Sequence, residues 1–174
     1  MNSRHILPQA LNFVVYTVLQ LILMRNLVLF DVSFCYLYLG FLLLLPIETG
    51  VIVSMLLGFA VGLLVDIFYN TFGIHAAACV FVMYARHYWI EAITPRGGYD
   101  LGVTPTPQSL GLRWFLTYAF PLTLVHHALI FFIEMGSFAL FYYTLIKVLA
   151  STAFTLVMVI VIQYILQSSR RPVL

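Results

Sequence analysis

The sequence predicts an all-α integral membrane protein, a bundle of six transmembrane helices with both termini in the cytoplasm. Hydrophobic residues make up 63% of the 174-residue chain, charged residues make up 8%, and the mean hydropathy is +1.05. One soluble core cannot bury that much apolar surface, so lipid has to solvate most of it. Because a span needs roughly 20 residues, the chain has room for six spans in a single transmembrane domain, residues 1–174, and for no soluble domain.

The first two spans lie in the first quarter of the chain. Residues 6–24 form an apolar run that no small-residue cleavage site follows, which indicates an uncleaved first span. The second span, residues 32–45, ends before Pro46. Its length of about 14 residues would reach about 21 Å as a helix, less than the ~30 Å hydrocarbon core. We therefore expect it either to extend back across Asp31 or to lie where the bilayer thins.

Turn residues separate the other four spans. The third span, residues 49–68, ends before a turn at residues 70–73, and the fourth covers residues 74–90. A loop rich in proline and glycine, at about residues 93–111, leads to the fifth span, residues 112–133. A second turn at residues 134–137 leads to the sixth, residues 138–166, and Pro172 stops any further helix.

The arginines orient the predicted bundle. Six spans place both termini and the loop at 93–111 on one side of the membrane, and the positive-inside rule assigns that side to the cytoplasm because it holds nearly all the basic residues. They are Arg4, Arg86, Arg96, Arg113, Arg170 and Arg171, against Arg25 alone on the other side. We expect the charges near the cytoplasmic span ends, Arg86 among them, to be solvated or loosely paired. Basic residues this scattered predict no nucleic-acid partner.

A stripe of small residues runs along the third span. It consists of Gly50, Ser54, Gly58 and Gly62 and ends in Asp66, with four residues from each member to the next. Residues at this spacing share one face of a helix, and small side chains let another helix approach closely in lipid. The stripe therefore predicts either packing against a neighbouring span or an interface for a partner protein.

Asp66 lies about one helical turn from the end of the third span, where a carboxylate is costly unless it is hydrated, neutralised or paired. His75, at the start of the fourth span, can reach it across the turn that contains Gly73. Two interpretations are open. The pair locks the hairpin between these spans, or Asp66 is a polar element of a pocket or an interface.

A second group of polar residues lies on the last two spans. His126, His127 and Glu134 belong to the fifth span, and folding the sixth span back places Lys147 at the depth of the histidines. These four residues either satisfy one another and hold the two helices together, or line a hydrated outer cavity that binds a ligand or senses protons. Adjacent histidines point about 100° apart on a helix, which is poor geometry for a metal site. We expect no metal or cofactor and, because hydrolase and nucleotide-binding motifs are absent, no enzyme.

One segment resembles a known family. The run LGFAVGLLVDIF at residues 57–68, followed by GIHAAA at residues 73–78, is similar to the signature region of the bacterial rod shape-determining protein MreD family. Gly58, Gly62, Asp66 and Gly73 are the positions that match. The loop at residues 94–99 and the histidine pair with Glu134 resemble Bacteroidetes-type members. The resemblance covers most of residues 10–166, and the short second span departs from it.

The resemblance implies a non-enzymatic scaffold in the bacterial cytoplasmic (inner) membrane, which acts in cell shape and peptidoglycan synthesis. It implies binding to an MreC-like protein and, through it, to a RodA-type glycosyltransferase, a class B penicillin-binding transpeptidase and MreB. The implied fold is similar to the S components of energy-coupling-factor transporters. That similarity supplies an alternative function, a small-molecule-binding membrane component of a transporter.

Overall fold

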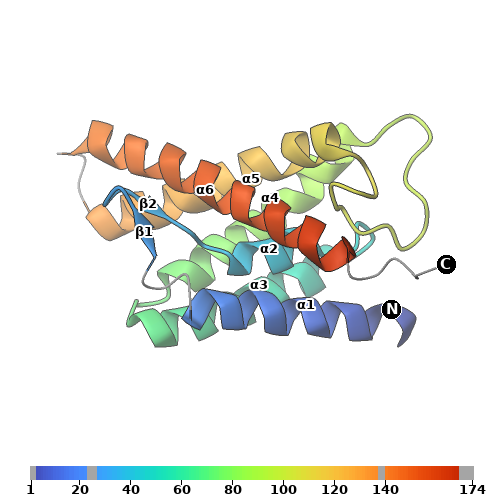
Figure 1. Cartoon of the computed structure of the whole chain (residues 1–174), viewed down its shortest axis with the longest axis horizontal. Coiled ribbons are helices and arrows are strands. Elements are labelled where there is room, and N and C mark those ends of the chain that lie inside the picture. The colour runs from blue at the N-terminus through green and yellow to red at the C-terminus, as the bar shows by residue number, and fades with distance from the viewer. Residues whose placement is uncertain (1–2, 23–26, 137–139, 169–174) are drawn as a thin grey trace.

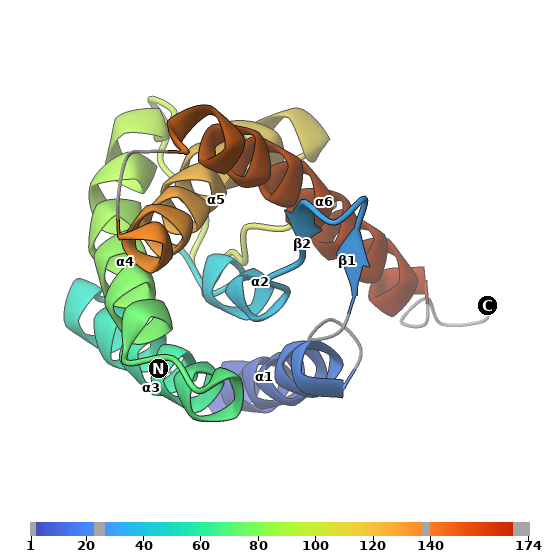
Figure 2. The same cartoon turned by 90° about the vertical axis from the view of Figure 1, so that its left-hand side faces the viewer.

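The computed structural model describes residues 3–22, 27–136 and 140–168, and the chain is mostly helical. Among the described residues, five long helices form a ring around a short buried one (Figure 2). The start of α1, the end of α6 and the loop between α4 and α5 lie at one end of the bundle (Figure 1). The elements in chain order are α1 (Ser3–Ile22), β1 (Val28–Leu29), β2 (Ser33–Phe34), α2 (Tyr38–Leu43), α3 (Val51–Tyr69), α4 (Ile74–Ile93), α5 (Leu112–Met135) and α6 (Phe141–Ser168).

Three of the described helices, α3, α5 and α6, are long and apolar enough to cross a membrane. The apolar part of α1, Gln9–Ile22, is shorter. The ranges of α3 to α6 lie close to the predicted spans 49–68, 74–90, 112–133 and 138–166. Some predictions concern positions outside the described residues: Arg25, Arg170, Arg171 and Pro172, and the span residues 23–24 and 138–139.

The prediction of a helix over residues 32–45 is wrong. Only Tyr38–Leu43 is α-helical, and before it β1 and β2 form a small antiparallel hairpin in which Val28 pairs with Phe34. The hairpin turns at Phe30 and Asp31, which both have left-handed φ angles (54° and 58°). Residues 28–45 begin with the hairpin at one end of the bundle and continue into the interior of the ring, where α2 lies (Figures 1 and 2). We call this stretch the second crossing. From Ser33 to Leu45 this stretch is mostly buried within the protein, although Leu29, Phe30 and Asp31 are exposed, and irregular backbone in a membrane protein is tolerated where protein buries it.

The small-residue stripe of α3 packs against α4. A Cβ atom on Gly62 would lie 2.5 Å from the Ala76 Cα atom, and one on Gly58 would lie 3.1 Å from the Cys79 carbonyl oxygen. Ser54 is also buried on this face. Of the two interpretations of the stripe, the structure favours packing within the chain. A partner cannot use Gly58 or Gly62 while α4 covers them.

The ends of the stripe have other roles. Gly50 precedes the first residue of α3, and a Cβ atom added to it would meet no other atom within 4 Å. Gly73 adopts φ +84° immediately before α4, a conformation that favours glycine. Asn70 ends α3 in the left-handed region at φ 55°. The α3–α4 turn is therefore set by Asn70 and Gly73, and the helix contact by Gly58 and Gly62.

We predict that Gly62→Ala destabilises the protein, because the added methyl group would collide with α4 backbone that cannot rotate away. Overpacking of this kind costs on the order of 1–3 kcal/mol. Thermal unfolding of the purified protein in detergent should show a lower Tm for Gly62→Ala. Gly50→Ala is the matched control, since open space surrounds its Cβ position, and its Tm should stay close to that of the parent. Equal Tm values for the two variants would contradict the close contact.

Candidate functional site

Side chains from the surrounding helices hydrogen-bond to the backbone of the second crossing. On α1, the Gln20 Oε1 atom accepts the backbone N–H groups of Leu37 (2.5 Å) and Tyr38 (3.4 Å), and its Nε2 atom donates to the Tyr69 hydroxyl (2.7 Å). Gln20 is completely buried. The Gln20 side chain thus binds backbone N–H groups at the start of α2, and it also joins α1 to the end of α3.

Two hydroxyls on α6 accept further backbone N–H groups. The N–H of Phe34 donates to Ser151 Oγ (2.9 Å), and the N–H of Tyr36 donates to Thr155 Oγ1 (3.1 Å). Both hydroxyls are completely buried. The segment before α2 is not helical, so its own backbone offers no acceptors for these N–H groups. The two hydroxyls of α6 are the acceptors instead.

Side chains of α4 and α5 donate hydrogen bonds to backbone carbonyls at and just after the carboxyl end of α2. The Tyr118 hydroxyl donates to the Leu43 carbonyl (2.8 Å), and Arg86 Nη2 donates to the Leu45 carbonyl (2.6 Å). Arg86 Nε also donates to the Tyr118 hydroxyl (2.6 Å). Arg86 is only 2% exposed, so the prediction that it is a solvated surface charge is wrong. The last carbonyls of a helix lack helical donors; Tyr118 supplies one to the Leu43 carbonyl of α2, and Arg86 supplies one to the Leu45 carbonyl just beyond the helix.

A cluster of aromatic and imidazole rings fills the bundle next to α2. The Tyr36 ring contacts the rings of His75, His126 and His127, with centroid distances of 5.4, 5.9 and 5.1 Å. The Tyr38 hydroxyl lies 3.0 Å from His126 Nε2. We call these five residues the imidazole cluster. All five are buried, and they bring separate segments of the chain together: the second crossing, α4 and α5.

Asp66 caps the first turn of α4. Its Oδ1 atom accepts the backbone N–H of His75 (3.1 Å), and Oδ2 accepts that of Ala76 (2.9 Å). The Thr71 hydroxyl and His75 Nδ1 (3.1 Å) also bond to Oδ1. A carboxylate at a helix N-terminus meets unpaired N–H groups and the positive end of the helix dipole. His75 reaches Asp66 as the sequence predicts, and the geometry favours the interpretation of a locked hairpin.

The predicted group on the last two helices separates into two pairs. Lys147 Nζ lies 3.8 Å from Glu134 Oε2, and it also lies 4.4 Å from the centre of the Phe131 ring. His126 and His127 contact each other, with ring centroids 5.4 Å apart. No hydrogen bond or ion pair of the described residues joins the two pairs, and the Phe131 ring contacts both Lys147 Nζ and the His127 ring.

Both histidines of α5 are engaged inside the protein. His127 contacts the Thr123 carbonyl through Nδ1 (2.8 Å) and Thr155 Oγ1 through Nε2 (3.1 Å), which joins α5 to α6. His126 contacts Tyr38 and, at 3.7 Å, Cys79 Sγ. These polar partners of the histidines lie outside the predicted group of four residues, and both histidines are completely buried. Across the described residues, no group of three His, Cys, Asp or Glu side chains is placed to hold a metal ion.

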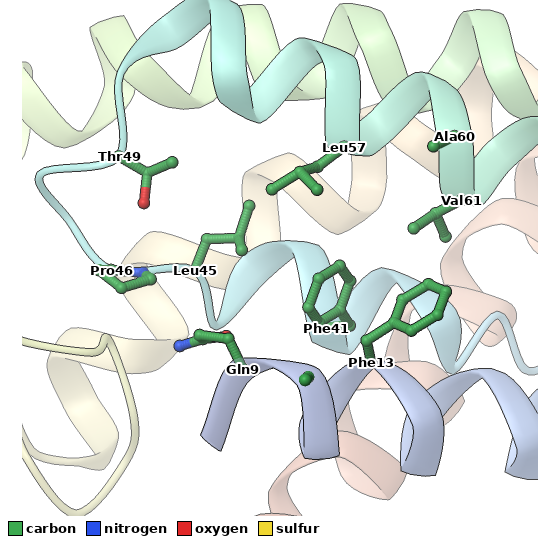
Figure 3. Close-up of a pocket in the computed structure, with 10 residues that line it drawn as sticks. Gln9, Phe13, Phe41, Leu45, Pro46, Thr49, Leu57, Ala60 and Val61 are labelled. Atoms are coloured by element: carbon green, nitrogen blue, oxygen red, sulfur yellow. The ribbon is translucent and has the colours of Figure 1, made fainter. Parts of the chain in front are cut away.

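An apolar groove lies between α1, α2 and α3, with a volume of about 330 Å³ (Figure 3). Exposed Ala10 and Ala60 flank its mouth, and buried Phe41 and Val61 form its floor. Its lining is almost entirely apolar, with Gln9 and Thr49 as the polar members. The groove is therefore suited to apolar surface and not to a charged ligand.

Sequence reasoning missed the side chains that satisfy the second crossing. Gln20, Tyr118 and Thr155 are visible in the sequence as polar residues inside apolar runs. That signal marks a buried polar group, but it does not identify the partner. A regular helical span needs no outside donors or acceptors, so the partners become visible only once residues 32–37 are known to lie outside any α-helix.

No match to the chain is found among protein families, curated proteins or solved structures. The structure itself defines the class: a helical protein with three helices, among the residues described, that are long and apolar enough to cross a membrane. Its core is distinguished by a short helix whose backbone depends on buried polar side chains of the ring.

We predict that Gln20→Met destabilises the protein more than Gln163→Met does. Gln20 accepts two buried backbone N–H groups, and each buried donor left unpaired costs roughly 1–3 kcal/mol. Gln163, which is also buried, donates to a side chain only, the Tyr16 hydroxyl (2.8 Å). Chemical unfolding in micelles, followed by tryptophan fluorescence, measures the difference. If Gln163→Met is equally or more destabilising, the backbone of the second crossing does not depend on Gln20.

Proposed function

We propose that the protein is a non-enzymatic membrane scaffold of the bacterial cell-wall elongation (rod) complex, which acts in cell shape by binding an MreC-like partner. The observation that supports this most is the use of its buried polar side chains. Asp66, His127, Gln20 and Arg86 bond to helix ends, to other side chains and to the second crossing. The outer surface, which is apolar, is then the surface available for function.

The groove between α1, α2 and α3 is the proposed partner surface. Ala10 and Ala60 at its mouth are small, and small residues let two helices approach closely in lipid, where association depends on packing. A transmembrane anchor helix of an MreC-like protein can place apolar side chains against Phe41 and Val61. Through that partner the scaffold would reach the RodA-type glycosyltransferase, the class B penicillin-binding transpeptidase and MreB.

A small-molecule-binding transporter component is the second candidate. The groove volume of about 330 Å³ falls within the range of ligand pockets, roughly 300–1,000 Å³. Such pockets use a few convergent polar groups to fix a ligand, and this groove offers Gln9 and Thr49. The histidines from which this candidate was predicted lie in the imidazole cluster, engaged with Tyr38 and Thr155. The scaffold function is therefore better supported.

We predict that Ala60→Phe reduces co-purification of the host's MreC-like protein several-fold in mild detergent, because the larger side chain fills the mouth of the groove. Cells that depend on the variant should become round. Ala153→Phe is the matched control, since Ala153 is exposed on α6, away from the groove, and its partner binding should match the parent. Equal recovery of partner with both variants would contradict the proposed surface. A bound metabolite lost only from Ala60→Phe would favour the transporter component.

The proposed orientation places both termini at the cytoplasmic face, in the inner membrane. The turn between α3 and α4 and the loop between α4 and α5 lie at opposite ends of the bundle (Figure 1). Phe72 in the turn and Leu101 in the loop are highly exposed, and the native Cys35 and Cys79 are buried. We predict that a membrane-impermeant maleimide labels Phe72→Cys in intact spheroplasts, and labels Leu101→Cys only after the membrane is opened. The reverse pattern would overturn the orientation.

A further inference from the structure

A second cavity, of about 280 Å³, opens beside the C-terminal end of α4. It adjoins the loop between α4 and α5, at the end of the bundle where α1 starts and α6 ends (Figure 1). We call it the Arg86 cleft. Its lining is half polar, unlike that of the groove, and consists of Ile47, Arg86, His87, Ile90, Glu91 and Thr94.

The positive charge of Arg86 is only partly compensated. Its three hydrogen bonds go to neutral acceptors: the Tyr118 hydroxyl, the Leu45 carbonyl and the Pro46 carbonyl (3.4 Å). No carboxylate oxygen of the described residues lies within 4.0 Å of the guanidinium. Neutral acceptors carry no net charge, so the positive charge of Arg86 has no ionic counterpart among the described residues.

One nitrogen of this guanidinium is free for a ligand. The hydrogen bonds among the described residues use Nε and Nη2 of Arg86 and none uses Nη1. A buried charge without an ionic partner is costly, and arginine binds phosphate through charge-assisted hydrogen bonds. The side chain is fixed by Tyr118 and Leu45, so little conformational entropy is lost when a ligand binds.

We infer that the Arg86 cleft binds the phosphate group of a phosphoester, with Arg86 Nη1 as the donor. The volume of about 280 Å³ lies near the lower limit of ligand pockets, roughly 300 Å³, which suits a lipid headgroup or a small phosphate compound. Glu91 is exposed at the cleft, and its carboxylate disfavours a second negative charge. The ligand is therefore a singly charged phosphodiester in preference to a polyanion.

The test uses the purified full chain in dodecylmaltoside and phosphate-free buffer. The probes are dioctanoyl phosphatidylglycerol, dioctanoylglycerol, which has the same acyl chains without phosphate, and inorganic phosphate. Native mass spectrometry measures binding of each probe, and Tm confirms the fold of each variant. We expect phosphatidylglycerol to bind and dioctanoylglycerol not to bind. Binding of inorganic phosphate as well would indicate that the phosphate alone is sufficient, and its failure to bind would indicate recognition of a lipid headgroup.

Two variants that each add one carboxylate distinguish the effect of a negative charge in the cleft from that of a negative charge elsewhere on the protein. His87→Glu adds a carboxylate to the lining of the cleft, and Ala92→Glu adds one at an exposed position of the same helix outside the lining. Neither residue bonds to the second crossing, so both variants should fold. We expect His87→Glu to weaken phosphatidylglycerol binding about tenfold or more, because the added carboxylate repels the phosphate, and Ala92→Glu to leave it nearly unchanged. Glu91→Gln should strengthen binding.

Three results would overturn the inference: equal binding of dioctanoylglycerol and phosphatidylglycerol, equal effects of His87→Glu and Ala92→Glu, or no binding of either phosphate probe. The inference is independent of the proposed scaffold function. No partner protein takes part in the measurement, so a negative result would contradict the phosphate site and would not contradict the scaffold function.

Discussion

The structure depends on hydrogen bonds to the backbone of the second crossing. Each buried backbone group left unpaired costs roughly 1–3 kcal/mol, and this segment lacks a regular helical ladder before and after α2. The ring supplies the missing partners from four helices: Gln20 on α1, Arg86 on α4, Tyr118 on α5 and Thr155 on α6. These helices are held together through the segment that they surround.

The remaining long helix, α3, is held in a different way. Gly58 and Gly62 bring it against the backbone of α4, and Asp66 binds the first N–H groups of that helix. The stripe of α3 packs along α4, whereas α1 is joined to α3 by the hydrogen bond from Gln20 Nε2 to the Tyr69 hydroxyl at the end of α3. The apolar groove lies between α1, α2 and α3 (Figure 3).

Local features of this fold could be predicted from the sequence, and long-range ones could not. Helix ranges, the turn at Gly73 and the contact between Asp66 and His75 depend on residues close together in the chain. Arg86 was expected at a solvated end, because its position near a span end is visible and its acceptors, 40 and 41 residues away, are not. The extended part of the second crossing was missed for the same reason, since its stability depends on side chains of other helices.

The two roles of Arg86 follow from a single geometric fact. The guanidinium has donors on three nitrogens, and the carbonyls beyond α2 together with Tyr118 occupy two of them. A lysine in its place has one nitrogen and cannot satisfy the Leu45 carbonyl and the Tyr118 hydroxyl with the same fixed fork. The requirement for a fork at the end of α2 therefore places a third, unused donor beside the cleft. The charge that the fold needs in order to close its buried segment is also the charge that makes the cleft suitable for an anion.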